Sequence, residues 1–153
     1  MTIFHGMNTT ASALTAQRLR MDVISSNMAN VDTTRAKQVN GEWEPYRRKT
    51  VTMSSAEGKF STFLNGAMGK QIKGVEGNGV KVSRIKEDNE TPFKLIYNPT
   101  HPDANADGYV QMTNVDPLKE MVDLMSATRS YEANVTVFNA NKNMLSKALE
   151  IGK

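Results

Sequence analysis

The residues best suited to chemistry lie at positions 103–108, where the sequence DANADG matches the first half of an EF-hand calcium loop. Carboxylate and amide oxygens at alternate positions are good Ca²⁺ ligands, and the glycine allows a sharp turn. The second half of the loop does not match, because Asn114 stands where a bidentate Glu is needed. Pro99 and Pro102 also occupy the place of the entering helix. We therefore predict a turn between two strands here, with no metal and no cofactor.

Patterns typical of catalysis are weak elsewhere in the chain. His5 and His101 are the two histidines, and neither has a nucleophile and a carboxylate at a spacing that suggests a triad. Residues 66–70 (GAMGK) have the wrong spacing for a phosphate-binding loop, and Gln71 replaces the hydroxyl that would hold magnesium. Because the chain has no Cys, disulfides, thiolate catalysis and Cys-ligated metal sites are excluded. We predict that the protein is not an enzyme.

A basic run with neighbouring aromatics raises the possibility of nucleic-acid binding. Trp43 and Tyr46 could stack on bases, and Arg47, Arg48 and Lys49 could contact phosphates, in a chain whose formal net charge is +3. Successive side chains on a strand alternate between its faces, so a solvated strand edge is the preferred interpretation. A small nucleic-acid-binding protein, with an affinity that falls steeply with salt, stays as an alternative.

The N-terminal element is predicted to be a helix over residues 8–30. Apolar residues repeat at heptad spacing through Met7, Leu14, Met21 and Met28, with Ile24 and Val31 at the second position of the repeat. Asn30 tolerates the left-handed conformation of a helix C-cap, and the β-branched residues that follow it disfavour a longer helix. Residues 1–7 contain no Lys or Arg and lead into no apolar run, so we expect neither a cleaved signal peptide nor a transmembrane helix.

The C-terminal element is predicted to be a long helix from Pro117 to Gly152. Asp116 is a good N-cap, and Pro loses no hydrogen bond at the first helical position. Its heptad seam contains Met121, Val135 and Leu149 at one position and Leu124, Tyr131, Phe138 and Leu145 at the other. Apolar residues also lie off this seam, notably Leu118, Val122, Met125, Ala133, Ala140 and Ala148. A helix that is apolar on several sides needs several partners, which favours assembly.

Short alternating segments between the helices predict strands at 42–53, 80–85, 93–97 and 109–112. Residues 54–79 are rich in Gly and are predicted to be a flexible loop, and we expect the strands on either side of it to form a small sheet. The predicted fold class is α+β, with the long N- and C-terminal helices paired as an α-helical coiled coil and a small β-rich body between them. The predicted parts are a helix at 1–35, the β-rich body at 36–113 and a helix at 114–153.

Two terminal motifs resemble the flagellar rod and hook protein family. Residues 27–30 (NMAN) are similar to the family's Asn-Leu-Ala-Asn motif, and residues 130–135 (SYEANV) are similar to its C-terminal helix. The motif residues carried over are Asn27, Ala29, Asn30, Tyr131, Ala133 and Asn134. Central segments such as 45–47 (PYR), 107–110 (DGYV) and 114–116 (NVD) resemble the short proximal-rod members. Residues 34–36 (TRA) depart from the Gly and aromatic usual in hook and distal-rod members.

The resemblance implies a structural subunit of the proximal rod of the flagellar basal body, part of the drive shaft needed for motility. Its partners would be copies of itself, other rod proteins, the export apparatus and the membrane-ring junction. It would lie outside the cytoplasmic membrane, exported by the flagellar type III apparatus without a cleaved signal peptide, and it would neither span the membrane nor bind nucleic acid. A cytoplasmic coiled-coil adaptor or chaperone, or a different rod-family member, are the alternatives.

The assembly interface is expected along the two heptad seams. We expect apolar contacts within and between subunits from Leu14, Met21, Ile24, Met28, Val31, Met121, Leu124, Tyr131, Val135, Phe138, Leu145 and Leu149.

Overall fold

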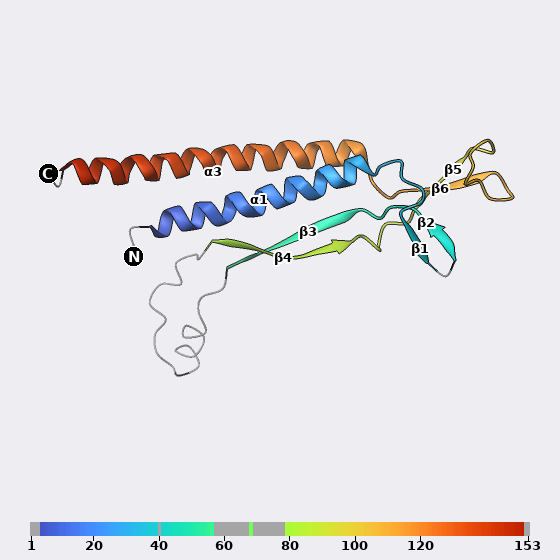
Figure 1. Cartoon of the computed structure of the whole chain (residues 1–153), viewed down its shortest axis with the longest axis horizontal. Helices are drawn as coiled ribbons and strands as arrows, with labels where there is room; N and C mark the ends of the chain where they lie inside the picture. Colours follow the sequence, from blue (N-terminus) through green and yellow to red (C-terminus); the bar gives the residue numbers. More distant parts are fainter. Residues whose placement is uncertain (1–3, 40, 57–67, 69–78, 152–153) are drawn as a thin grey trace. The chain divides into compact units, whose positions relative to one another are not determined.

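The computed structural model describes residues 4–39, 41–56, 68 and 79–151. Two helices, α1 (His5–Ala29) and α3 (Pro117–Ile151), are each continuous (Figure 1). Both predicted helices are confirmed, although α1 begins three residues earlier than predicted and the predicted end of α3 at Gly152 lies outside the described residues. Neither helix has the length and apolar character needed to cross a bilayer, over the part of the chain that the structure describes.

The ends of the helices follow from local chemistry. Asp116 Oδ1 accepts a hydrogen bond from Leu118 N at 3.1 Å, so Asp116 caps the first turn of α3 as predicted. At the end of α1, Asn30 N donates to Ser26 O at 3.2 Å, and the Asn30 side-chain amide donates to the same carbonyl at 2.8 Å. The chain then leaves the helix, because Thr33 N already donates to Asn30 O in a turn at 3.2 Å.

The described strands pair as three separate two-stranded sheets, and the prediction that the strands on either side of residues 54–79 form a small sheet is confirmed for Lys49–Ser55 and Val80–Glu87. Strand β1 (Lys37–Val39) pairs with β2 (Glu42–Glu44), and β5 (Lys94–Tyr97) pairs with β6 (Tyr109–Met112), both antiparallel. The predicted strand at 42–53 is interrupted because Pro45 has no amide for a ladder and Tyr46 N donates instead to Thr33 O at 3.0 Å.

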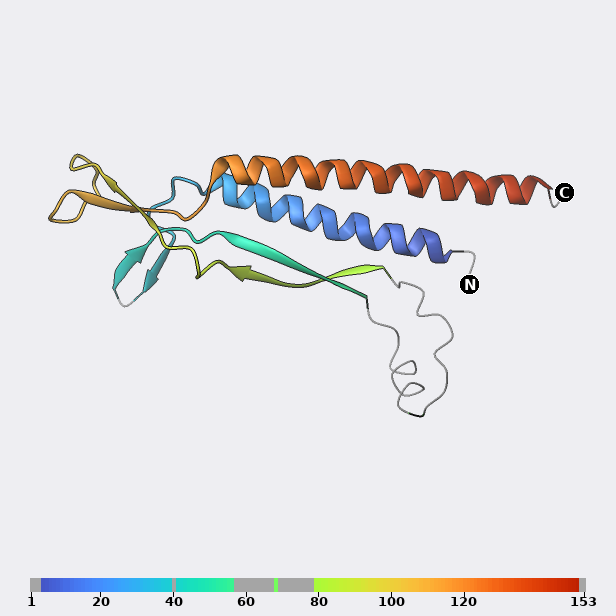
Figure 2. The ribbon, with the colours of Figure 1, turned by 180° about the vertical axis from the view of Figure 1, so that it is seen from behind.

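The third sheet is a long ribbon of β3 (Lys49–Ser55) and β4 (Val80–Glu87), seen in both Figure 1 and Figure 2. Asp88 N donates to Arg48 O at 2.8 Å at one end, and Ala56 N donates to Gly79 O at 2.9 Å at the other, so the strands run antiparallel. The predicted flexible loop at 54–79 falls mostly outside the described residues.

The chain divides into two compact units, which we describe separately. Unit 2 comprises Arg20–Val51 and Ile85–Ala127, and unit 1 comprises Met1–Leu19, Thr52–Arg84 and Thr128–Lys153. The buried apolar residues of unit 2 among the described residues are Val23, Ile24, Tyr46, Val110, Val115 and Ala127. In unit 1, Ala16 is buried. Over the described residues both units therefore bury few apolar side chains, and buried polar groups take a large share of the interior of unit 2.

The prediction that the two helices pair as a coiled coil is wrong. Glu120 and Ala127 are the buried residues of α3, and neither belongs to the predicted seam. The seam residues Met121 and Leu149 are instead 50% and 76% exposed. A heptad pattern indicates that a helix has an apolar stripe, but it does not specify whether the chain itself covers that stripe. The fold class is α+β, with two-stranded sheets between the two helices in sequence.

Gly79 gives a test of close packing in unit 1. Its φ of +91° is left-handed, and an added Cβ would overlap Ser12 Oγ, which accepts a hydrogen bond from Val80 N at 3.1 Å. Gly79→Ala is expected to lower the free energy of unfolding by about 1–2 kcal/mol from backbone strain, and further through the lost Ser12 bond. Gly41→Ala is the control, because Gly41 has a φ of +93° with open space around it. Urea unfolding should show a larger loss for Gly79→Ala; equal losses would contradict the packing argument.

Candidate functional site

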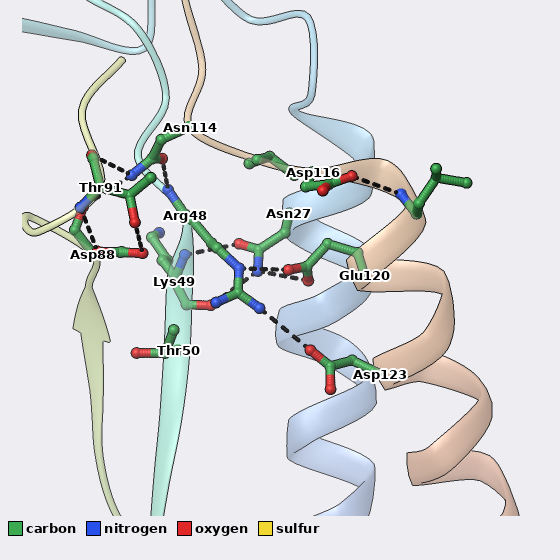
Figure 3. Close-up of polar contacts among 12 residues, drawn as sticks. Asn27, Arg48, Lys49, Thr50, Asp88, Thr91, Asn114, Asp116, Glu120 and Asp123 are labelled. Atoms are coloured by element: carbon green, nitrogen blue, oxygen red, sulfur yellow. Dashed lines mark hydrogen bonds and ion pairs between the residues drawn. The ribbon is translucent and has the colours of Figure 1, made fainter. Parts of the chain in front are cut away.

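Asn27 lies at the centre of a buried polar cluster in unit 2, shown in Figure 3. Its amide nitrogen donates to Lys49 O at 2.9 Å and to Glu120 Oε2 at 3.0 Å. Its amide oxygen accepts from Lys49 N at 2.9 Å and from Tyr46 Oη at 3.1 Å. Asn27 is only 1% exposed, so these four bonds satisfy both of its donors and both lone pairs of its acceptor. One amide thus connects α1, β3 and α3.

Charged groups complete this polar cluster, which we define as Asn27, Tyr46, Arg48, Glu120 and Asp123. Glu120 has no exposed surface, and its Oε1 accepts from Arg48 Nε at 2.5 Å. The Arg48 guanidinium also contacts Asp123 Oδ2 at 3.3 Å (Figure 3). Arg20 contacts Asp123 Oδ1 at 3.2 Å. A buried carboxylate requires such pairing, because an isolated charge in a poorly solvated site is costly.

The position of Arg48 corrects the prediction that the basic run 47–49 forms a solvated strand edge. The Arg48 side chain is only 14% exposed and lies against Glu120. Strand β3 begins after it, at Lys49, so the alternation of a strand does not apply to Arg48. Arg47 behaves more as expected, with a half-buried side chain that lies 3.9 Å from Glu44 and over the Phe93 ring.

Asn114 holds the backbone of Arg48 in place through hydrogen bonds. Its Oδ1 accepts from Arg48 N at 2.7 Å, and its amide nitrogen donates to Asp88 O at 2.9 Å and Thr91 O at 3.2 Å. Asn114 is 4% exposed, so these bonds satisfy a buried amide. The polar cluster therefore has a fixed support on the β3 side.

The arrangement is suited to holding elements together. Asn27 uses its full hydrogen-bonding capacity on protein groups, and the carboxylates pair with guanidinium groups from the same unit. Over the described ranges, no group of three or more His, Asp or Glu side chains is placed to hold a metal ion. The geometry connects the end of α1 to the start of α3 through the backbone of β3.

The segment 103–108 connects β5 to β6, which confirms the predicted turn between two strands. Gly108 N donates to Asn105 O at 2.8 Å within this turn. Asp103 accepts from Arg35 Nε at 2.6 Å and from Thr34 Oγ1 at 2.7 Å. These bonds, that of Arg35 above all, hold the pKa of Asp103 below its ordinary value. The carboxylate at the first position of the calcium-like pattern therefore anchors the turn to the segment after α1.

Removing the Arg35 contact should raise the pKa of Asp103. A lowered pKa means that the contact stabilises the fold above the ordinary pKa of an aspartate, and that this stabilisation is lost as the pH falls through the lowered value. Arg35→Met is expected to move the NMR-detected titration of Asp103 to higher pH. Asp88, whose pKa is lowered by hydrogen bonds from Thr91, is an internal control that should not move. An unchanged titration of Asp103 would contradict the assignment to Arg35.

The predicted interface residues are not gathered into one buried layer. Ile24 is buried, and Met121 and Leu149 are exposed. The others are half-buried: Leu14, Met21, Met28, Val31, Leu124, Tyr131, Val135, Phe138 and Leu145. Among the motif residues, Asn27 is buried, Asn30, Tyr131 and Asn134 are half-buried, and Ala29 and Ala133 are exposed. Asn134 donates to Ser130 O of its own helix at 2.8 Å.

Sequence reasoning missed most of the polar cluster. Asn27 was singled out as a motif residue, but its buried partner Glu120 and the ion pair of Glu120 with Arg48 were not recognised. A Glu in the first turns of a helix is ordinary, because it is favourable near the positive end of the helix dipole, so Glu120 gave no signal of burial. Asn114 could have been found, since it belongs to the segment 114–116 that carries part of the family resemblance.

The first turns of α3 are amphipathic, but their more apolar face is the exposed one. Glu120, Asp123, Leu124 and Ala127 form the face that is buried or half-buried within unit 2. The opposite face carries an exposed stripe, which we call the outer stripe: Leu118, Met121, Val122 and Met125, each between 50% and 74% exposed. The apolar side chains thus point away from the unit, and carboxylates point into it.

Comparisons with known proteins agree with the motifs in both terminal segments. A family model described as flagella basal body rod protein matches residues 7–37, and one described as flagellar basal body rod FlgEFG protein C-terminal matches residues 106–151. The flagellar basal-body rod protein FlgC of Bacillus subtilis (strain 168) is 68% identical over 153 residues, which cover all of both chains.

More distant relatives carry the same name. FlgC of Borreliella burgdorferi is 40% identical over 162 residues, with 99% of this chain and 98% of that one covered. FlgC of Escherichia coli O157:H7 is 43% identical over 143 residues, which cover 93% of this chain and 92% of that one. The chain therefore belongs to the FlgC family of flagellar basal-body rod proteins.

Proposed function

We propose that this structural rod subunit assembles, in the proximal part of the rod, through apolar side chains that its own fold leaves exposed on the two helices. The observation that supports the proposal most directly is the outer stripe of α3. Its spacing of i, i+3, i+4 and i+7 is that of a helix face that packs on another helix. The partner would be a helix of a neighbouring rod subunit.

The energetics favour burial of the outer stripe. Fully burying a Val, Leu or Met side chain is worth about 1.5–3 kcal/mol, so four half-exposed residues leave several kcal/mol unused in the free monomer. A contiguous exposed apolar patch on a soluble protein is typical of an interaction site. The carboxylates on the opposite face of the same turns are already paired, so turning the apolar side of this part of α3 inward would break those pairs.

The remaining helical residues extend the proposed interface. In unit 1, the half-buried seam residues Tyr131, Phe138 and Leu145 alternate along α3 with the exposed residues Val137 and Met144. We propose that the predicted interface residues contact neighbouring subunits as far as they are not buried in the monomer. A contact between different surfaces of successive subunits repeats without closing and so generates a helical tube.

The proposal extends to export and location. The subunit would pass the flagellar type III apparatus unfolded and without cleavage, and then assemble outside the cytoplasmic membrane with other rod proteins and near the membrane-ring junction. The small number of buried apolar side chains among the described residues suits such a route, because little of their apolar area has to be exposed for these segments to unfold. The absence of Cys avoids disulfide cross-links in transit.

Cross-linking tests the proposed interface. Because the chain has no Cys, Met125→Cys introduces a single thiol on the outer stripe, and Ala127→Cys introduces one on the buried face as a control. In isolated basal bodies, a short bismaleimide should link the Met125→Cys subunit to a rod partner that carries a single Cys on one of its terminal helices. The Ala127→Cys control should give no link. Free reaction of Met125→Cys with a monofunctional maleimide in intact rods would contradict the proposal.

A further inference from the structure

The start of α3 raises the question of why its larger apolar face points outward. The outer stripe holds four apolar side chains, whereas the inward face holds Glu120 and Asp123 beside Leu124 and the small Ala127. Burial of apolar surface alone would therefore favour the opposite rotation of the helix, with the stripe turned toward the interior of unit 2. Some other interaction within unit 2 must decide which face is buried.

We propose that Glu120 and Asp123 are positioning residues that fix the rotation of α3 about its axis and so keep the outer stripe available for assembly. Both carboxylates contact the same Arg48 guanidinium, at 2.5 and 3.3 Å, and Glu120 also accepts from Asn27 at 3.0 Å. Figure 3 shows these groups between the two helices and β3. This inference rests on the proposed function for its purpose, but its structural content can be tested in the free subunit.

Asn27 and Arg48, which donate hydrogen bonds to the carboxylates, cannot easily move to follow a rotated helix. Asn27 holds both the N–H and the C=O of Lys49, and Asn114 holds the N–H of Arg48. A rotation of α3 by about half a turn would leave the Arg48 guanidinium without its carboxylates in a site where its side chain is only 14% exposed. Removing one partner of a buried ion pair is strongly destabilising, and this cost opposes the gain from burying part of the outer stripe.

The charge pattern thus selects one rotation of α3 about its axis. Buried ion pairs add little net stability compared with apolar residues of similar size, but they accept few geometries. A helix with apolar residues on both sides could populate two rotations about its axis. A polar inward face and an apolar outward face select one of them. The stripe is therefore exposed because the carboxylates hold it so, and not because it is the more polar face.

Thiol labelling of the purified full-length subunit reports the rotation directly. Val122→Cys places a thiol on the outer stripe, and Ala127→Cys places one on the buried face, in a chain that has no other Cys. In the native background the first should react fast with a maleimide and the second slowly. Each is then combined with Arg48→Met, Glu120→Ala and Asp123→Ala, which remove the ion pairs and leave the stripe as the larger apolar face.

The expected result in that background is a reciprocal exchange. Labelling of Val122→Cys should slow by about tenfold or more, because rotation of α3 buries this thiol. Labelling of Ala127→Cys should speed up by a similar factor, because the same rotation exposes it. Arg129→Met with Glu132→Ala, which removes exposed charges from the same helix, is the matched control and should leave both rates as they were. Native labelling rates in a folded triple variant would overturn the proposal.

If both thiols react fast and far-UV circular dichroism shows lost helix, the triple variant has unfolded, and Glu120→Gln with Asp123→Asn then decides the matter. This pair keeps the side-chain shapes and removes both negative charges. It should produce a partial exchange of the two labelling rates, and native rates would again overturn the proposal. Since no rod is present in these measurements, an exchange of rates together with a failed Met125→Cys cross-link would reject the proposed interface and leave the positioning role intact.

Discussion

Phe138→Asp is expected to abolish motility when the variant replaces the native subunit in a cell. Phe138 is half-buried on α3, beside the exposed Val137, on the part of the helix that we propose to contact neighbouring subunits. A carboxylate brought into an apolar layer without a partner costs several kcal/mol, and the cost recurs at every subunit of the assembly. Swimming in soft agar and electron microscopy of isolated basal bodies measure the loss.

The control for this prediction is Phe138→Leu, which stays apolar and removes only part of the side chain. It should support swimming close to the native level, since a smaller apolar residue leaves the proposed contact without a charge. Immunoblots must show equal amounts of the native and both variant proteins, so that degradation is not mistaken for failed assembly. Normal swimming by the Asp variant at a normal protein level would reject the proposed interface at this position.

Arg48→Met is expected to lower the free energy of unfolding by about 3–5 kcal/mol. Met keeps much of the apolar stem of Arg but leaves Glu120, which has no exposed surface, without its guanidinium partner. The cost comes from the buried carboxylate that remains and not from the value of the ion pair itself. Urea unfolding followed by far-UV circular dichroism measures the change.

The neighbouring residue supplies a matched control. Arg47→Met removes the same charge one position earlier, where the partly exposed side chain pairs with Glu44 at 3.9 Å and lies over the Phe93 ring. Contacts of these two kinds at partly exposed sites contribute about 0–1 kcal/mol each, so this variant should lose much less stability than Arg48→Met. Equal losses for the two variants would mean that burial of Glu120 does not govern stability here.

The helices and most strands could be predicted from the sequence because their signals are local. Asp116 followed by Pro117 determines the start of α3 through bonds that span only a few residues. Alternating residues identify β4, β5 and β6 in the same way, and an Asp/Asn/Gly composition identifies the turn at 103–108. Strand β1 was missed, since three residues carry too little periodicity to be recognised.

Family membership could also be inferred from the sequence alone, because it rests on short motifs at fixed positions. The motif at 27–30 pointed to the rod family, and the comparisons over the full chain confirm it. The motif did not reveal what Asn27 does. Its bonds to Tyr46, Lys49 and Glu120 join residues 19, 22 and 93 positions away, and no local pattern specifies such partners.

Which face of each helix is buried was decided only in the tertiary structure. Periodicity locates an apolar stripe, and the usual inference is that the stripe packs inside the molecule. At the start of α3 the reverse holds, because Glu120 and Asp123 find Arg48 on a segment 72 and 75 residues away and bury the polar face with it. The sequence by itself thus determined the elements and the family, whereas long-range pairing of charges buries the polar face at the start of α3. We propose that this pairing keeps the outer stripe exposed for other subunits.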